Sequence, residues 1–385
     1  MTGPLDLVAL SLLWTEGADR KPARRAAPEP QAPDTAGPDP RTLTDLDEVL
    51  KILHVADTAG KAAELRRRAA AALLAAGRQG IGVVPRGHPD YPFRLEALVD
   101  PPPVLWVRGS PERCRFAVAI VGSRFATRQA LDVGFRMGEG LSRAGFVVVS
   151  GLARGVDAAA HRGALRAGGR TVAVLGNGAD IIYPPEHAAL AEDIAGAGAL
   201  LTEFAPGVPP RGWHFPRRNR IISGMSLGVV IVEAAKRSGS LITAKCALDQ
   251  GRSVMAVPGA VPGGRNRGAH GLMRDGAGVV EEARDVVEQL LSDWPREFDG
   301  EAPASNPGVP DGPDTRPAPV IAAPGADPIL RAMEPAEAYR LEELEARTGL
   351  AAVPLMARLT RLEVDGWIER AEGGRFVKAG RNVLR

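Results

Sequence analysis

Residues 117–124 are AVAIVGSR, an apolar run that ends at once in glycine, serine and arginine. A short apolar run closed by turn residues is typical of a strand buried on both faces. Residues 146–155, FVVVSGLARG, repeat this pattern. Between the two runs, Leu131, Phe135 and Leu141 recur at a helical spacing. Strand, helix and strand in this order predict a parallel sheet.

Three more apolar runs follow, each closed by a loop of small residues. They are TVAVL at 171–175, LGVVIV at 227–232 and SVMAV at 253–257. Together the runs predict an α/β fold class, an extended Rossmann-like core with a parallel sheet flanked by helices. The carboxyl ends of parallel strands meet at one edge of a sheet, so the loops after these strands converge there.

These loops favour an anionic ligand. Glycine lets the backbone approach a ligand closely, and free N–H groups at the following helix starts attract phosphate. A glycine at a single strand–helix turn is common scaffold in any α/β fold. Five converging loops, two of which carry Arg124 and Arg154, predict an anion site at this edge.

The same loops do not match the motifs of nucleotide cofactors. Gly122-Ser123-Arg124 does not continue as G-x-G-x-x-G. Ser150 and Gly151 stand where a dinucleotide fold places an acidic residue for the ribose. The chain also lacks a G-x-x-x-x-G-K-S/T stretch. We therefore expect no NAD, no ATP and no other cofactor.

Composition limits the class of protein further. The chain has 385 residues, of which 45% are apolar, enough for a sizeable core and more than one domain. Cys114 and Cys246 lie far apart, without metal-ligand spacing, which indicates a reduced cytoplasmic protein and no metal. The apolar run from Leu5 to Trp14 contains Asp6 and is too short to span a membrane. We expect a soluble protein with no membrane association.

The positive charge is concentrated in one segment. The formal net charge is only +2, so a site for a polyanion must be a local patch. Residues 211–275 contain eleven basic and three acidic side chains, while the rest of the chain is net acidic. Such a segment suits a nucleic-acid backbone, and the alternative is a solvated basic surface. Aromatic residues beside arginines can stack unpaired bases. For Phe215 a place in the core is equally plausible, and for Trp213 a place in the core is more plausible than base stacking.

The chain divides into four predicted parts. Residues 1–80 form a degenerate helical N-terminal region with a disordered insertion at about 20–41, and residues 81–292 form the core. Residues 293–328 are a Pro/Gly-rich linker, and residues 329–385 form a small winged-helix domain. This last part has ten basic and nine acidic side chains, so contact with protein is as well supported as contact with duplex DNA.

Several stretches jointly resemble the DprA (Smf) family of DNA-processing proteins over about residues 81–290. FPRRNRIISG at 215–224 resembles the family's F-P-x-R-N-R-I-I-S/A signature. SGLARGVD at 150–157 and VEAAKRSGSLITA at 232–244 resemble two further family motifs, and VPG follows at 257–259. The stretch from Tyr91, YPFRLEALVDPPPVLWVRG, is similar to the family's lead-in to the core.

The resemblance implies a function. Proteins of this family bind and protect single-stranded DNA, form homodimers, and help to load the recombinase RecA during natural transformation or related recombination. The resemblance implies no catalytic activity. Two other functions stay open: a nucleotide-processing enzyme of a related Rossmann-like fold, and a duplex DNA-binding regulator that uses the winged helix. The chain lacks a catalytic glutamate at the spacing that phosphoribohydrolases of the related fold use.

Motif positions, local charge and placement together predict the DNA-binding residues. By motif, Arg124 contacts a phosphate, and Arg218, Asn219 and Arg220 shape or line the groove. The whole predicted set consists of Gly122, Ser123, Arg124, Ser150, Gly151, Arg154, Phe215, Arg217, Arg218, Asn219, Arg220, Lys236, Arg237, Ser238, Gly239, Ser240 and Lys245. No catalytic or metal-binding residue is predicted.

Three polar residues near these motifs are expected to support the site. Asp157 and His161 would hold a loop and a helix cap, and Glu233 would orient neighbouring arginines. The chain also departs from the family pattern, because His270 and Gly271 stand where many members carry an Asn-Arg pair. That arginine contact would be missing unless Arg265 or Arg267 replaces it.

Overall fold

The computed structural model describes residues 4–17, 46–52, 57–111, 114–294, 328–334, 337–364, 367–371 and 374–378. The predicted disordered insertion at 20–41 and nearly all of the predicted linker lie outside these residues. The division of the chain into four parts stays a prediction.

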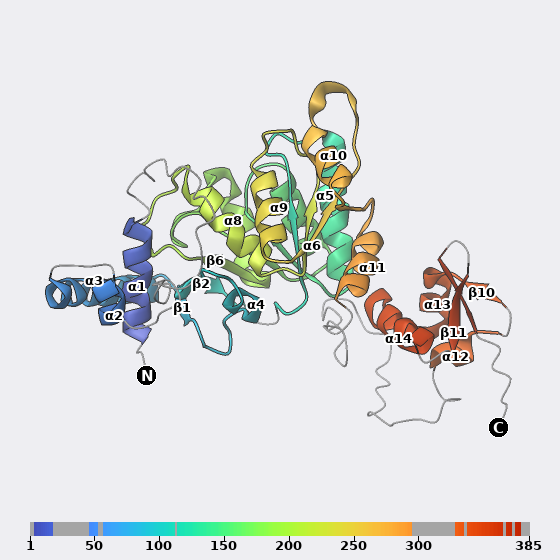
Figure 1. The fold of residues 1–385 in the computed structure, drawn as a ribbon, viewed down its shortest axis with the longest axis horizontal. Helices are drawn as coiled ribbons and strands as arrows, with labels where there is room; N and C mark the ends of the chain where they lie inside the picture. The colour runs from blue at the N-terminus through green and yellow to red at the C-terminus, as the bar shows by residue number, and fades with distance from the viewer. Residues whose placement is uncertain are drawn as a thin grey trace, which may run out of the picture.

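A large, mostly parallel sheet forms the centre of the molecule (Figure 1). Strands β3 to β9 run parallel to one another, while β2 pairs antiparallel with both β6 and β1 at one end of the sheet. The order in the sheet, within the described residues, is β1 (Gly82–Pro85), β2 (Val104–Gly109), β6 (Ala199–Thr202), β5 (Thr171–Val174), β4 (Val147–Ser150), β3 (Ala117–Val121), β7 (Gly228–Ile231), β8 (Ser253–Ala256) and β9 (Gly278–Val279).

The sheet confirms the predicted α/β fold class. All five predicted strands of the core are present to within one residue at each end. Strand β6 was not predicted. Its four residues lead into Glu203 and Phe204 rather than into a loop of small residues, so the pattern that reveals the other strands is absent.

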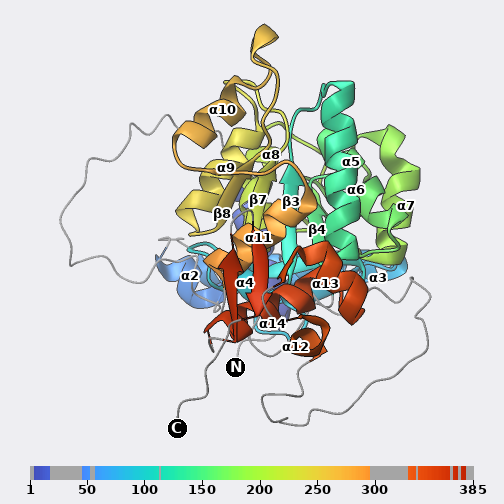
Figure 2. The same ribbon diagram turned by 90° about the vertical axis from the view of Figure 1, so that its right-hand side faces the viewer.

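Helices cover both faces of the sheet (Figure 2). One face carries α5 (Arg128–Arg143), α6 (Val156–Arg166), α7 (Ala188–Ala197) and α11 (Ala283–Asp293). The other face carries α4 (Phe93–Glu96), α8 (His214–Gly224), α9 (Ser240–Asp249) and α10 (Arg267–Arg274). Alternate strand residues serve the two layers: Val118 and Ile120 pack on the α5 side, Ala119 and Val121 on the α8 side.

The order of the strands places a crevice at β3 and β7. From β3 the chain adds β4, β5 and β6 on one side, and it then returns to add β7, β8 and β9 on the other. The loops after β3 and β7 therefore leave neighbouring strands in opposite directions. Ligands of open α/β sheets bind at such a switch point, outside the carboxyl ends of the strands.

The N-terminal helices pack at the antiparallel end of the sheet. They are α1 (Pro4–Gly17), α2 (Leu46–Ile52) and α3 (Thr58–Arg78), and their apolar side chains join those of Val104 and Trp106 of β2 (Figure 1). The apolar run of the sequence lies in α1. Among the described residues, no helix is long and apolar enough to cross a membrane.

The C-terminal unit has the predicted winged-helix architecture. It consists of α12 (Pro328–Ala332), β10 (Ala338–Tyr339), α13 (Leu341–Thr348), α14 (Ala352–Val364), β11 (Ile368–Ala371) and β12 (Arg375–Lys378), with the strands in the order β10-β12-β11. Helix α14 packs against α11 of the core, and Arg284 of α11 forms an ion pair with Glu342 of α13. Two short 3₁₀ helices, Pro185–His187 and Pro262–Gly264, complete the elements of the described chain.

Candidate nucleic-acid interface

A cavity of about 740 Å³ opens at the switch point. The loops after β3 and β7 form two of its walls, and α8 forms another. Ten of the predicted residues line it: Gly122, Ser123, Arg124, Phe215, Arg218, Asn219, Arg237, Ser238, Gly239 and Ser240. The structure thus brings together residues that lie up to 118 positions apart in the sequence.

A shared carboxylate connects the loops after β3 and β7. Glu233 accepts hydrogen bonds from the Thr127 backbone N–H at 3.2 Å and from the Thr127 hydroxyl at 2.7 Å. Thr127 caps α5 in turn, because its Oγ1 accepts from the Ala130 N–H at 3.2 Å. The backbone of Glu233 has φ +68°, a left-handed conformation that costs free energy in a non-glycine residue. Glu233 therefore fixes the two walls relative to each other; Arg265 lies 3.9 Å from its carboxylate, farther away than Thr127.

The loop after β4 is held from beneath by Asp157. This carboxylate is 6% exposed and accepts from the Gly151 and Ala153 N–H groups at 3.1 and 3.4 Å. Burial raises the pKa of the Asp157 carboxyl, against the opposing effects of Arg218 and the two N–H groups. Asp157 thus holds the loop, as expected.

Close packing connects the loop after β4 with the loop after β3. Gly155 has φ +78°, and a Cβ atom there would lie 2.2 Å from the Ser123 carbonyl oxygen. Only glycine fits this position without displacing the cavity wall.

His161 lies in the core rather than at the cavity. Its Nδ1 is 2.7 Å from the Thr171 hydroxyl, which joins α6 to β5. Burial lowers the pKa of His161 to about 3, so the imidazole is neutral at physiological pH. His161 thus supports the fold of the loop region and is not placed to meet a ligand.

One face of α8 turns toward the cavity. The Arg218 guanidinium is 3% exposed and donates from Nη1 to the Val174 carbonyl oxygen, while its Nε has no hydrogen-bond partner among the described residues. A Cβ atom on Gly151 would lie 2.2 Å from Nη1, so this glycine makes room for the guanidinium. Burial lowers the pKa of Arg218 to about 10, with Asp157 opposing, so Arg218 stays charged at neutral pH.

Aromatic rings lie beside these arginines. The Phe215 ring is 5.3 Å from the Arg124 guanidinium and 5.7 Å from the Tyr183 ring. The buried residue of this segment is His214, whose Nδ1 lies 2.9 Å from the Gly176 carbonyl oxygen and whose ring packs on Phe204. Phe215 is therefore a wall of the cavity.

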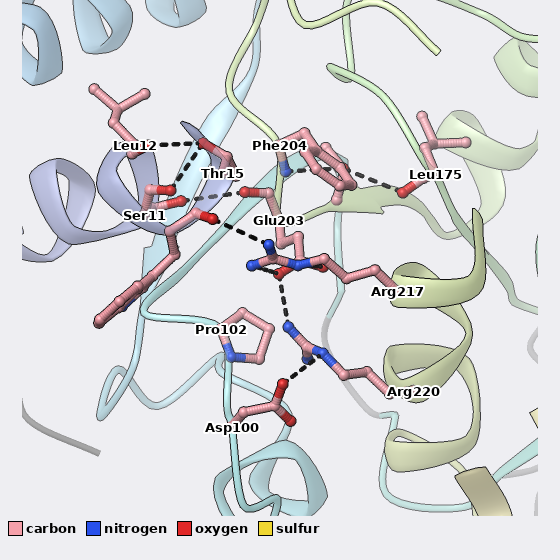
Figure 3. Close-up of polar contacts among 12 residues, drawn as sticks. Ser11, Leu12, Thr15, Asp100, Pro102, Leu175, Glu203, Phe204, Arg217 and Arg220 are labelled. Carbon is pink, nitrogen blue, oxygen red and sulfur yellow. Dashed lines mark hydrogen bonds and ion pairs between the residues drawn. The ribbon is translucent and has the colours of Figure 1, made fainter. Parts of the chain in front are cut away.

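Two arginines of the same helix lie elsewhere (Figure 3). Arg217 and Arg220 were expected at the groove, but both ion-pair with Glu203, which is 3% exposed, at 3.0 and 2.6 Å. Arg217 also donates to the Trp14 carbonyl oxygen at 3.1 Å, and Arg220 pairs with Asp100 at 3.1 Å. Residues three apart share a helix face, so both arginines lie on one side of α8, away from the cavity lining.

The remaining predicted residues are placed at the margin of the cavity or outside it. Ser150 is fully buried, and its hydroxyl donates to the Ile120 carbonyl oxygen at 2.6 Å. Gly151 and Arg154 line a smaller adjoining cavity, where Arg154 ion-pairs with Glu186. Lys236 and Lys245 are exposed and do not line either cavity.

The prediction missed several lining residues, chiefly Phe125 and Tyr183. Phe125 follows Gly-Ser-Arg directly, so an aromatic residue beside the arginine of that loop was the available signal. Arg265 lines the cavity, whereas Arg267 does not. Of the two arginines considered as replacements for the arginine of the family's Asn-Arg pair, Arg265 is thus the one that lies at the cavity. His270 instead lies 3.1 Å from the Gly259 carbonyl oxygen.

The cationic groups at the cavity differ in how far they are neutralised. Arg124 and Arg237 are exposed, and neither has an ion-pair partner in the described part of the chain. The two carboxylates of the lining, Asp157 and Glu233, are already engaged by N–H and hydroxyl groups. The cavity therefore presents a net positive surface to an anion.

Comparison with known proteins identifies the family. The family model of the DNA recombination-mediator protein A matches residues 82–291, more than half of the chain, and the DprA winged helix domain matches residues 313–374. Protein Smf of Escherichia coli (strain K12) is 40% identical over 294 residues, which cover 76% of each chain.

Solved structures agree with this match. The crystal structure of DNA processing protein A (DprA) from Streptococcus pneumoniae has a TM-score of 0.58 and 32% identity, and covers 74% of this chain and 93% of that one. A structure on the single-stranded DNA binding mode of DNA processing protein A from Helicobacter pylori has a TM-score of 0.50 and 27% identity, and covers 55% and 96%. The chain belongs to the family of the DNA recombination-mediator protein A, DprA or Smf.

Proposed function

We propose that this protein binds single-stranded DNA in the cavity at the β3–β7 switch point. The observation that carries the proposal is a concave, cationic site in which Arg124 and Arg237 have no ion-pair partner among the described residues. Their guanidinium groups would bind backbone phosphates. The Gly122–Ser123 loop and the Ser238–Ser240 loop would add N–H and hydroxyl donors.

The shape and lining of the cavity favour a single strand. Phe215 and Tyr183 offer ring faces inside a cavity, and only bases that are not stacked in a duplex can reach such faces. A reader of duplex DNA instead inserts a protruding helix or ribbon into a groove. The related protein of Helicobacter pylori is described by its single-stranded DNA binding mode.

Binding explains the cavity better than catalysis does. A nucleotide-processing enzyme would need a carboxylate placed to exchange protons with its substrate. Asp157 is buried under its loop, and Glu233 is bonded to Thr127, and these are the carboxylates of the described lining. Release of a base from nucleoside monophosphates by the purified chain would contradict a purely binding role.

The core supports the DNA site better than the winged helix does. In winged-helix proteins that bind duplex DNA, the second helix of the helix-turn-helix lies in the major groove. Here that helix, α14, packs against α11, and Arg284 of α11 pairs with Glu342. Removal of residues 329–385 should therefore leave most single-strand affinity intact, whereas a regulator that acts through the winged helix would lose its binding.

We extend the proposal to the recombination step. The family description, recombination-mediator, supports a protein that holds single-stranded DNA and passes it to the recombinase RecA, in natural transformation or related recombination. A homodimer that protects the strand is part of the same proposal. RecA filament formation on DNA coated with a single-strand binding protein, measured with and without this chain, tests it.

The decisive experiment compares single-strand and duplex affinity. Labelled oligo-dT and a duplex of equal length are titrated with wild type, Arg124→Ala and Arg237→Ala, and with Arg162→Ala, an exposed arginine of α6 outside the cavity, as the control. We expect a preference for oligo-dT and a loss of about 1–2 kcal/mol for each cavity arginine. The salt slope should also fall by about 0.7 for each contact removed. Equal affinity of wild type and a variant that combines Arg124→Ala with Arg237→Ala would refute the site.

A further inference from the structure

One large apolar side chain at the cavity is left almost entirely in solvent. The Phe125 ring is 81% exposed, more than any other large apolar side chain that the structure describes. Burial of a phenylalanine stabilises a fold by about 1.5–3 kcal/mol, and this ring contributes little of that to the unliganded protein. A single exposed apolar residue is ordinary on a surface, so the surroundings of Phe125 decide what it means.

The backbone that carries the ring is fixed. The Phe125 carbonyl oxygen accepts from Arg265 Nη1 at 2.9 Å. Two residues later, Thr127 is bonded to Glu233 and caps α5. The ring is therefore presented from an anchored loop, and its ordering would cost less free energy than that of a ring on a free loop.

Cationic groups flank this ring. Arg124 precedes it, Arg265 bonds its carbonyl group, and both line the same cavity as Phe125, together with Arg237. An apolar partner protein would leave these charges without counterions on binding. A polyanion that also carries flat apolar faces satisfies both features, and unpaired nucleic acid is such a molecule.

We propose that Phe125 is a stacking platform for an unpaired base, adjacent to the nucleotide whose phosphate Arg124 binds. The proposal rests on the proposed function and adds a base-contacting residue to it. The Arg124 guanidinium lies 5.3 Å from the Phe215 ring centre, Phe125 follows Arg124 directly in the chain, and all three residues line the cavity. Base stacking on Phe125 gives affinity that does not depend on which base is present, because every base has a ring face.

The test separates stacking from charge. Wild type, Phe125→Ala and Phe125→Trp are titrated with oligo-dT and with an abasic strand of the same length, which keeps the phosphates and lacks the bases. We expect Phe125→Ala to lose about tenfold in affinity for oligo-dT and to bind the abasic strand as wild type does. Phe125→Trp should keep the affinity for oligo-dT, and its added fluorescence, taken as the difference from wild type, should be quenched by oligo-dT and not by the abasic strand.

A matched control is Phe93→Ala, which removes a ring that is 49% exposed at a different cavity. Its affinity for oligo-dT should equal that of wild type. Because Phe125 is exposed, the thermal midpoint of Phe125→Ala should stay that of wild type, and a binding loss would not reflect unfolding.

The outcomes distinguish the two proposals. Unchanged binding of oligo-dT by Phe125→Ala, with a loss in Arg124→Ala, would overturn the stacking inference alone. An equal loss for oligo-dT and the abasic strand would also overturn it. Absence of oligo-dT binding by wild type would overturn the proposed function.

Discussion

The two faces of α8 carry arginines from one short motif and use them differently. On the cavity face, Arg218 contacts a backbone carbonyl group and lies near Phe215 and Asp157. On the opposite face, Arg217 and Arg220 are neutralised by the buried Glu203 (Figure 3). Positive charge counted along a sequence is therefore not the charge available to a ligand. A nearby carboxylate determines which arginines remain free for phosphate.

The opposite face has a structural role that reaches beyond α8. Glu203 connects its two arginines to the end of β6, and Arg217 reaches the Trp14 carbonyl group of α1. The Ser11 hydroxyl of α1 donates to the Glu203 carbonyl oxygen at 3.1 Å. This ion cluster, Glu203 with Arg217, Arg220 and Asp100, joins the N-terminal helices to the core, and none of its four residues lines the cavity of the proposed DNA site.

The largest expected effect is on the ion cluster. Glu203→Ala leaves two partly buried guanidinium groups without their shared carboxylate, so we expect the free energy of unfolding to fall by about 3–5 kcal/mol. Urea unfolding of the full chain measures this loss. Glu192→Ala, which breaks the more exposed pair with Arg108, is the control and should cost about 1 kcal/mol or less. A similar small loss in both variants would show that the two kinds of ion pair are energetically alike here.

A second variant sharpens the comparison between the two faces. Arg220→Ala removes one partner of Glu203 and leaves Arg217 in place, so we expect a loss of about 2 kcal/mol in the free energy of unfolding. Its affinity for oligo-dT at low temperature should equal that of wild type, because Arg220 does not line the cavity. Arg124→Ala should give the reverse result, with lower affinity and an unchanged unfolding midpoint. If Arg220→Ala bound oligo-dT as weakly as Arg124→Ala, the assignment of the two faces would be wrong.

The smallest expected effect is a dependence of the free energy of unfolding on pH, caused by the buried His161. Burial lowers the pKa of His161 to about 3 in the folded chain, against about 6.5 when unfolded. As the pH falls, His161 therefore takes up a proton in the unfolded chain before it does so in the folded chain. The stability that the neutral imidazole provides above pH 6.5 is lost progressively as the pH falls toward 3. At pH 5.5 this one group should cost about 1.4 kcal/mol relative to pH 7.5.

The measurement compares urea unfolding of wild type and His161→Gln at the two pH values. The glutamine cannot take up the proton, so the difference between the two pH values should shrink by about that amount. An undiminished difference in His161→Gln would assign the pH dependence to other groups, such as Asp157.

Local pattern predicted the features that depend on neighbours in sequence. Short contiguous stretches of sequence encode the five apolar runs, the loops of small residues and the winged-helix elements. Each of these features appears in the structure. The position of the cavity followed from one rule about parallel sheets. Gly122 to Arg124 and Ser238 to Ser240 accordingly lie in its wall.

The sequence could not show what depends on distant pairing. Glu203 is 14 and 17 residues from its arginines, and Trp14 is 203 residues from Arg217, so no local pattern reveals these contacts. Strand β6 is short, and Glu203 follows its last residue, Thr202, so neither the strand nor the partner of the arginines was predicted from the sequence. The loop of Phe125 is likewise anchored by Arg265, which lies 140 residues away, so no local pattern reveals this contact either.

The ion cluster has a consequence for how the F-P-x-R-N-R signature is interpreted. Its last arginine, Arg220, donates from Nη2 to Glu203 and forms an ion pair with Asp100. Arg217, at the variable position of the signature, donates from Nε and Nη2 to the two carboxylate oxygens of Glu203 and from Nη1 to the Trp14 carbonyl oxygen. A lysine has a single ammonium group and cannot reproduce that planar fork. Arg217→Lys would therefore weaken the joint between α1 and the sheet, and Arg220→Lys would weaken the contacts of α8 with Glu203 and Asp100. In this chain, one side of the helix that carries the DNA-processing signature therefore helps to hold the N-terminal helices against the core.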